Sequence, residues 1–507
     1  MSATPEFIHY GRWWFRLGKW VVFAVLLGAF AAVYLHIAGL LITQTNYTDK
    51  DILGADQKHN LKTALLTRED LKPDFSKGVS EPFKRWFPHR TDGVIQPLWP
   101  WIAAWLADAD HEISGTQEVT EQDRVLFNRG RWFNVGMTLG FLLLLGVTCA
   151  RVFSLPAALN VVLLAGFGAL LPRAVYFQPE PVYFIFFLLT WVACIFALKQ
   201  NSLWSYGLVG AFSGIAYMAK GSVSPLVAVF IGVGTLRWAW GWVLARLPGE
   251  RSTLWVRRNH FFGLFMLVMC HLMMAGPRLA DAAEKFGDPF HSYPGYWMWF
   301  DDFDTGFRWM NDHGDARTLQ SIPPSEKPSF SNYNAAHTTE QMIDRLVSGT
   351  KTKLTEFLAP GVTAKSRTPK PWKGVLELRG VYLGALLLIL ASLALVIRVA
   401  SPKATHSGER LHPETATIVL FVAGSFAAYS LLYGWYTPIG RGDRFMLSLY
   451  APLVLSLVWA CESLLKRARR RKAHIRIFTG YEIAQWILFA AVVWRVIQIL
   501  QFPHFRN

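Results

Sequence analysis

The sequence predicts an all-α polytopic membrane protein with about eleven transmembrane helices and two long loops on one side of the membrane. The first observation is composition. Of 507 residues, 52% are hydrophobic and only 17% are charged, too few charges to cover a soluble protein of this size. The second is the grouping of apolar residues into runs of roughly 20, the length that a spanning helix needs. The third is an aromatic content of 15%, which is typical of proteins that contact membrane interfaces.

The predicted spans follow one another along the chain. The first is long and lacks the small-residue cleavage site of a signal peptide, so we expect it to be retained. The four cysteines all lie inside apolar runs, which predicts no disulfide framework. The eleven spans are residues 20–42, 133–150, 155–171, 182–198, 203–219, 223–242, 261–275, 381–397, 416–432, 445–461 and 483–500.

The net charge of 51 − 35 = +16 is compatible with nucleic-acid binding or with membrane topology. With the N-terminus inside, most cations of the short segments fall on the inner side, including the run KRARRRK at 466–472. This bias predicts an inner N-terminus and an outer C-terminus. The basic run then anchors the chain to anionic lipids, and no nucleic-acid partner is expected. The opposite short loops carry only Arg173, Lys220, Arg441 and Arg444.

The same orientation places both long polar segments, 43–131 and 276–379, on the outer face. A transporter usually has short loops and polar groups near the bilayer centre. Polar residues concentrated on one face instead favour an enzyme that works at the outer membrane surface. No P-loop, nucleophile elbow or dinucleotide-binding fingerprint occurs in a suitable context.

Three carboxylates follow the first span, at Asp49, Asp51 and Asp56. Apolar residues recur with helical spacing after Asp56, which predicts that it lies at a helix N-terminus, where negative charge is favourable. It is then either a plain capping residue or a group with a chemical role. Further along, the stretch QPLWPWIAAWLAD at 96–108 is too short to span. Its three Trp and its early prolines predict an interfacial helix.

Four more polar residues lie at the mouths of later spans. Glu180 stands between two prolines, where a carboxylate is costly unless it has a partner or a role; an ordinary interfacial Glu is the alternative. Lys220 is the single charge between two apolar helices and either snorkels to the surface or neighbours an anionic group. Arg441 and Arg444 occur where topology alone would not place arginines, and guanidinium groups suit a phosphate.

The second long loop contains a carboxylate cluster. Asp301, Asp302 and Asp304 could bind a divalent cation through oxygen ligands, or they could simply be solvated. The aromatic residues of the stretch YPGYWMWF at 293–300 could stack on sugar rings or rest on lipid. The segment 338–358 has helical periodicity with a threonine as its cap, and we expect it to form a lid or an interfacial helix.

These pieces, in this order, resemble the GT-C superfamily of membrane glycosyltransferases, and within it the branch of protein O-mannosyltransferases and lipid A aminoarabinose transferases. The stretch GADQKHNLKTA matches the acidic motif of that family at Asp56 and Ala64, with Gln57 in place of the second acid. The resemblance covers residues 1–240 and 415–465. Further matches are the QPLWPWIAAWLAD helix, Glu180, Lys220 within AKG and Arg444 within DRFMLSLYAPLV.

The resemblance implies one GT-C-like domain over residues 1–507 in a bacterial inner membrane, with its site facing the periplasm. The donor would be a sugar on polyprenyl phosphate, and the acceptor a hydroxyl of an envelope glycan, lipid or protein. Transfer would invert the configuration of the sugar. Membrane lipids would be the other partner, and no cofactor would be strictly required.

The resemblance also implies roles for individual residues. Asp56 would be the general base, and Glu180 would orient the acceptor or share that role. The phosphate of the departing lipid would be held by cations: Lys220, Arg441 and Arg444, with Lys58 and His59 as secondary candidates. A family lysine before the proline pair is replaced here by Ile95 and Gln96, so another cation must serve. Asp49 and Asp51 are secondary acidic candidates that could hold a divalent cation together with Asp56.

Three other functions compete with this one. A ligase or polymerase that uses a diphosphate-linked oligosaccharide could employ His89 or His337 as a catalytic group. A lipid or polysaccharide transporter would need polar groups at mid-membrane depth, and the candidates, such as His271, are scattered. In a noncatalytic envelope scaffold, the acidic loop residues would only be solvated.

Overall fold

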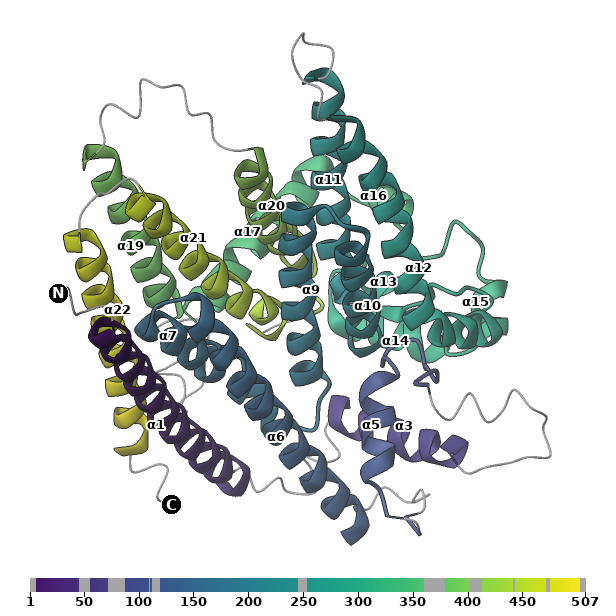
Figure 1. The fold of residues 1–507 in the computed structure, drawn as a ribbon. Helices are drawn as coiled ribbons and strands as arrows, with labels where there is room; N and C mark the ends of the chain where they lie inside the picture. Colours follow the sequence, from purple (N-terminus) through teal and green to yellow (C-terminus); the bar gives the residue numbers. More distant parts are fainter. Residues whose placement is uncertain are drawn as a thin grey trace, which may run out of the picture.

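The computed structural model describes residues 6–44, 55–71, 87–108, 110–111, 119–244, 253–359, 379–400, 413–440, 443–470 and 475–501. Every regular element within these residues is a helix and none is a strand, so the all-α class is confirmed (Figure 1).

Ten helices in the described part of the chain are long and apolar enough to cross a membrane, which indicates a multi-pass membrane protein. They form because uninterrupted apolar runs satisfy their backbone groups internally, as a lipid environment requires. The ten are α1 (Glu6–Gln44), α6 (Glu121–Val152), the α7–η2–α8 unit (Leu155–Ala174), α9 (Glu180–Gln200), α11 (Ser224–Leu244), α12 (Thr253–Phe286), α19 (Arg379–Ala400), α20 (Pro413–Trp435), α21 (Tyr450–Arg470) and α22 (Ile475–Gln501).

Ten of the about eleven predicted spans meet this length in the described part of the chain, and the one that does not is the segment 203–219. These residues do form a helix, α10 (Leu203–Ala219), of only 17 residues. At about 1.5 Å per residue it is shorter than a hydrocarbon core of about 30 Å. It packs along α9 and α12, so closely that a Cβ atom at Gly210 would overlap the backbone oxygen of Leu267. Small residues permit such close packing of helices.

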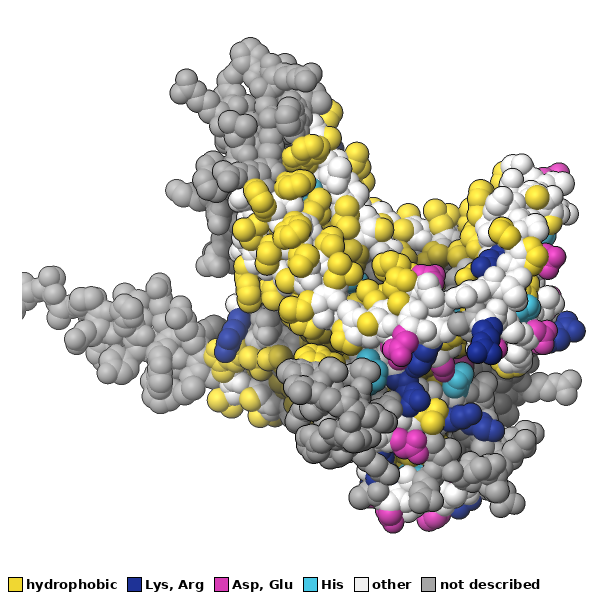
Figure 2. Space-filling model, turned by 90° about the vertical axis from the view of Figure 1, so that its right-hand side faces the viewer, with side chains coloured by type: hydrophobic (Ala, Val, Ile, Leu, Met, Phe, Trp, Pro, Cys, Tyr) yellow, Lys and Arg dark blue, Asp and Glu magenta, His cyan; other side chains and the backbone are white. Residues whose placement is uncertain are grey.

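The bundle has α7 at its centre, where it contacts α1, α6, α21 and α22. Polar side chains inside the bundle are paired across helices, as in the 2.8 Å hydrogen bond from Asn160 to the Gln485 side chain. By contrast, α12 exposes large apolar side chains, including Phe261, Phe265 and Met273. Figure 2 shows a face on which hydrophobic side chains cover the upper part and charged ones gather lower down and to the right. This division into an apolar band and a polar end fits a membrane protein.

At the polar end, short helices form what we call the loop layer. The predicted helix after Asp56, the short Trp-rich helix and the helix at 338–358 are all present. Thr338 caps the last of these by accepting from the backbone N–H of Gln341. The loop-layer helices are α3 (Ala55–Leu71), α5 (Leu98–Leu106), α13 (Tyr293–Trp297), α14 (Phe303–Asp312), α15 (Ala316–Ser321) and α16 (Phe330–Ala336), and α17 (Thr339–Leu358) follows them.

Direct hydrogen bonds join the two long loops of the sequence. The backbone N–H of Thr91 donates to Asp281 at 2.8 Å, and that of Tyr293 donates to the carbonyl oxygen of Gly93 at 2.9 Å. These bonds join the segment before α5 to the end of α12 and the start of α13, and α3 and α5 lie below α14 in the lower right part of Figure 1. The two loops are parts of one layer, although whether α5 and α17 rest on a membrane interface stays a prediction.

Helix α17 leaves this layer and packs against α20. The contact depends on two glycines, because a Cβ atom at Gly349 would overlap the backbone oxygen of Gly434. Further along α17, Phe357 is fully buried in the bundle core. This helix thus connects the loop layer to the spanning helices.

We predict that Gly349→Ala lowers the apparent unfolding temperature of the detergent-solubilised protein. Helix propensity alone would favour Ala by up to about 1 kcal/mol, but overlap at a tight contact costs about 1–3 kcal/mol. Gly384→Ala is the matched control, since a Cβ atom at that position would have no neighbour within 4 Å. If both substitutions raise the unfolding temperature equally, the glycine contact does not hold α17 on α20.

Candidate functional site

An ion pair joins two segments that lie 388 positions apart in the sequence. Asp56 lies in the first turn of α3, and Arg444 lies in the 3₁₀ turn η5 (Asp443–Phe445) that precedes α21. Arg444 Nη1 donates to Asp56 Oδ2 at 2.5 Å, with the side chains 31% and 55% exposed. Both groups are therefore partly exposed to solvent. The pair brings the predicted general base together with one of the predicted phosphate-binding cations.

Arg444 keeps its positive charge in this site. Burial alone would lower the pKa of its guanidinium, but the carboxylates of Asp56 and Glu180 outweigh burial and hold the pKa above its ordinary value. Arg444 is therefore a permanent cation between two acids.

A second ion pair lies beside the first. Glu180 occupies the first turn of α9 and is buried, and Lys220 caps the C-terminus of α10. Lys220 Nζ donates to Glu180 Oε1 at 3.1 Å. The other oxygen, Glu180 Oε2, is buried and has no hydrogen-bond partner among the described residues. Burying a charged oxygen without a hydrogen-bond donor is costly. We therefore expect Glu180 Oε2 to accept a hydrogen bond from water or a ligand.

The ring of Phe445 gathers three cations. Lys220 Nζ, Lys353 Nζ and the Arg444 guanidinium lie 5.4, 5.3 and 5.1 Å from its centroid, within the range of cation–π attraction. Lys353 is a site residue that the sequence did not identify. It shares a face of α17 with Gly349 and Phe357 through spacings of four, but one buried lysine on an amphipathic helix gives no sign of where it points.

Lys353 is almost fully buried and held in place. Its Nζ donates to Glu356 at 2.9 Å and to the carbonyl oxygen of Gly440 at 2.6 Å. It therefore fixes the segment just before Arg444, which makes it a positioning residue.

A cluster of buried hydroxyls lies next to these ion pairs. Tyr433 packs its ring 5.3 Å from Phe445, and the ring of Tyr183 lies 5.9 Å from Lys220 Nζ. Tyr183 lies near enough to interact with the hydroxyls of Ser222 and Ser448, and Tyr433 with that of Ser222. None of these contacts between described residues has full hydrogen-bonding geometry. Hydroxyls bonded this weakly retain capacity for water or a ligand. The four hydroxyls belong to Tyr183, Ser222, Tyr433 and Ser448.

Two neighbours of Asp56 have structural partners. Gln57, which replaces the second acid of the family motif, is buried and accepts from the backbone N–H of Phe177 at 3.1 Å. His59 Nε2 lies 2.6 Å from Asp92 Oδ2, so it turns to the loop before α5. Lys58 is exposed. The candidate site therefore includes Asp56 itself, while the predicted phosphate role of His59 competes with its pairing to Asp92.

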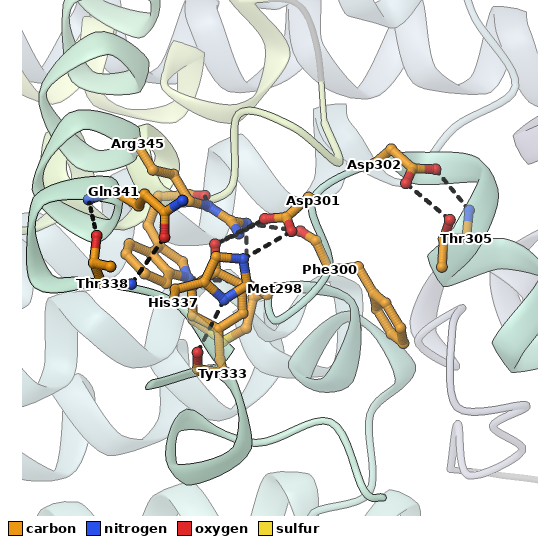
Figure 3. Close-up of polar contacts among 11 residues, drawn as sticks. Met298, Phe300, Asp301, Asp302, Thr305, Tyr333, His337, Thr338, Gln341 and Arg345 are labelled. Carbon is orange, nitrogen blue, oxygen red and sulfur yellow. Dashed lines mark hydrogen bonds and ion pairs between the residues drawn. The ribbon is translucent and has the colours of Figure 1, made fainter. Parts of the chain in front are cut away.

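The other predicted residues fall into two groups. Asp49, Asp51 and Arg441 lie outside the described residues. Asp301, Asp302 and Asp304 do not converge on one point, which corrects their assignment as a possible metal site. Asp302 caps α14 by accepting from Thr305 at 2.8 Å, whereas Asp301 points to other partners (Figure 3). Among the described residues no group of three His, Cys, Asp or Glu side chains could hold a metal ion.

Comparison with known protein families finds no match, and neither does comparison with characterised proteins. The chemistry of the site must therefore guide its interpretation. An accessible carboxylate in contact with a permanent cation, beside a half-satisfied buried carboxylate and further cations, can accept a proton and bind an anion within one small region.

The His59–Asp92 pair predicts a pH dependence. The hydrogen bond to Asp92 raises the pKa of His59, and burial opposes this only in part. A histidine whose pKa is raised by folding stabilises the folded protein fully when the pH is below its pKa in the unfolded chain, about 6.5. This stabilisation is lost as the pH rises through its pKa in the folded protein. Wild type should therefore exceed His59→Gln in unfolding temperature near pH 6, and the difference should vanish at alkaline pH. His89→Gln is the control, and a pH-independent difference would contradict the pairing.

Proposed function

We propose that this chain is a membrane glycosyltransferase that moves a sugar from a polyprenyl-phosphate donor to a hydroxyl of an envelope acceptor. The supporting observation is the contact of Asp56 with Arg444, beside Glu180 and Lys220. A transferase of this kind needs a base for the acceptor and fixed positive charge for the leaving phosphate. These groups lie together at the polar end of the spanning helices, where a lipid-linked donor can reach them.

In this scheme the Asp56 carboxylate takes the proton of the acceptor hydroxyl. The acceptor oxygen forms a bond to the anomeric carbon as the bond from that carbon to the phosphate oxygen breaks. The electron pair departs with the polyprenyl phosphate, whose negative charge Arg444 and Lys220 stabilise. Attack from the face opposite the phosphate inverts the sugar.

The ion pair in the ligand-free site has a part in this scheme. Arg444 cannot hold Asp56 and a phosphate with the same nitrogen atoms, so donor binding would draw Arg444 toward the phosphate. The Asp56 carboxylate would then lose its ion-pair partner and be free to contact the acceptor hydroxyl. Binding of the donor thereby prepares the base for the acceptor.

Glu180 and the buried hydroxyls suit the sugar. Glu180 Oε2 and the hydroxyls of Tyr183, Ser222 and Tyr433 have unused hydrogen-bonding capacity. Sugar hydroxyls both donate and accept, so they complement such a set. We assign Glu180 to holding the transferred sugar or the acceptor rather than to the main base role, because Lys220 already occupies one of its oxygens.

The proposal includes a location and an orientation. We place the loop layer in the periplasm and the N-terminus in the cytoplasm of a bacterial cell, because the short-segment cations gather at the opposite ends of the spans. Helix α10 would complete an eleventh crossing, with local thinning of the bilayer around a short helix.

The ligase alternative receives less support. Of its two candidate histidines, His337 has Nδ1 2.9 Å from the Tyr333 carbonyl oxygen and Nε2 3.0 Å from Asp301, so neither of its ring nitrogens is left for proton transfer to a substrate. The other candidate, His89, has Nδ1 3.0 Å from the Phe87 carbonyl oxygen.

Asp56→Asn should reduce sugar transfer by about 10²- to 10⁴-fold, because an amide cannot accept the proton. Binding of the donor should be unchanged or tighter, since Arg444 loses its carboxylate competitor. Transfer is followed with a radiolabelled polyprenyl-phosphate sugar, and binding with the same lipid.

Asp108→Asn is the matched control, because it breaks an Asp–Arg pair of similar exposure, to Arg129 at 2.6 Å. It should retain wild-type transfer. Wild-type turnover in Asp56→Asn would remove Asp56 from the base role.

Arg444→Ala should weaken binding of polyprenyl phosphate by about 10- to 100-fold, which corresponds to loss of one charge-assisted contact of roughly 1.5–3 kcal/mol. Arg129→Ala supplies the control for removing an exposed, paired arginine elsewhere. Equal affinity in wild type and Arg444→Ala would exclude Arg444 from the phosphate site.

A further inference from the structure

An open groove of about 460 Å³ lies on α17, and its lining includes none of the four residues Asp56, Arg444, Glu180 and Lys220. Its size falls within the range of roughly 300–1,000 Å³ that is usual for small-ligand sites. One wall is a single face of α17, and the other is formed by the loop layer and by the turn after α20. Its lining includes Asp301, His337, Gln341, Asp344, Ser348 and Thr437.

The groove has a rigid base. Arg345 is only 7% exposed, and it donates to Asp301 at 3.0 Å, to the Trp435 carbonyl oxygen at 3.0 Å and to the Phe300 carbonyl oxygen at 2.9 Å. Figure 3 shows Arg345 and His337 both directed at Asp301. The guanidinium thus bonds the segment at Phe300 and Asp301 and the segment at Trp435 to α17, which holds the groove in one shape and leaves the charge of Arg345 paired with Asp301.

The α17 wall is a stripe of small polar side chains. Gln341, Asp344, Ser348 and Thr352 recur at spacings of three and four, which places them on one helix face. The first three are exposed. Ser348 donates its hydroxyl to the Asp344 carbonyl oxygen at 2.6 Å, so its lone pairs remain as acceptors. This wall offers amide, carboxylate and hydroxyl groups at regular intervals.

A flat aromatic surface lies at one end of the groove. The rings of Tyr333 and His337 are stacked at 3.8 Å with an interplanar angle of 14°. Trp299 and Trp435 pack behind them, with centroids 5.8 Å apart. Tyr333 is buried, so the ring that the stack presents to the groove is the imidazole of His337, which is 22% exposed.

We infer that this groove binds a neutral carbohydrate chain. A sugar ring has apolar C–H faces that pack on a flat ring, and hydroxyls that pair with carboxylates, amides and hydroxyls. Among the described residues that line the groove, Arg345 is the only Lys or Arg, and it is already paired with Asp301, so these residues offer a phosphate or a nucleic acid no free cation. The polar walls equally disfavour a lipid tail or an apolar peptide.

The groove is linked to the candidate site through two shared segments. Helix α17 lines the groove up to Thr352 and then places Lys353 against Phe445. In the turn after α20, Thr437 faces the groove, while Tyr436 packs its ring 5.8 Å from Phe445. The idea that the groove guides a glycan acceptor to Asp56 rests on the proposed function. The idea that the groove binds carbohydrate does not.

Protection of an introduced cysteine tests the inference. Ser348→Cys is made in the full chain, and its labelling by a membrane-impermeant maleimide is timed with and without neutral oligosaccharides, namely hexa- to octasaccharides of glucose, mannose and galactose. The native cysteines Cys149, Cys194 and Cys461 are buried and Cys270 is partly buried, and unsubstituted protein gives the background. Ser325→Cys, exposed in the loop layer, is the matched control.

At least one oligosaccharide should slow labelling of Ser348→Cys while leaving Ser325→Cys unchanged. Asp344→Asn should weaken the binding of that oligosaccharide about tenfold, through loss of charge-assisted hydrogen bonds, and should leave polyprenyl-phosphate binding intact. Arg444→Ala should do the reverse, so failure of the groove and failure of the transferase assignment are distinguishable. Labelling of Ser348→Cys that none of these neutral oligosaccharides slows, or that slows equally in Ser325→Cys, would overturn the inference.

Discussion

The contact between Asp56 and Arg444 is the interaction on which the rest of the site depends. It ties the first turn of α3, in the loop layer, to the turn that begins α21 in the bundle. Gln57 supports it from one side by accepting from Phe177, and Lys353 supports it from the other by holding Gly440. Together with the hydrogen bond of Gln57, this contact ties the loop layer to the ends of the spans near Glu180 and Lys220.

The same contact sets the electrostatic state of the site. Asp56, Glu180 and Glu356 face Arg444, Lys220 and Lys353, and the charge of Arg173 also acts on Glu180. Because Arg444 and Lys220 are already paired with carboxylates, a phosphate that binds either cation must displace a carboxylate from it. In the proposed mechanism, that exchange would free Asp56 for the acceptor hydroxyl when the donor binds. The buried hydroxyls beside Glu180 would complement the uncharged part of the donor.

Sequence periodicity predicted the helices that are determined by residues close to one another in the sequence. Apolar runs produced the spans, and the N-terminal preference of Asp placed Asp56 in the first turn of α3. At α10 the length of the apolar run does not by itself explain the helix, because its 17 residues are supported by close packing on α12. The roles of Lys353 and Arg345 could not be predicted, because their partners come from distant segments. The metal assignment at Asp301, Asp302 and Asp304 failed because adjacent carboxylates in sequence point to different neighbours, one of them serving as a helix cap.

The proposed reaction specifies which lipid leaves. The most direct test incubates the purified wild-type protein with a polyprenyl-monophosphate sugar, labelled in the lipid, and a crude envelope glycan acceptor, and then identifies the lipid product. The proposed mechanism predicts free polyprenyl phosphate, formed in proportion to the sugar transferred. An unchanged donor under these conditions, together with turnover of a diphosphate-linked oligosaccharide and release of polyprenyl diphosphate, would contradict it.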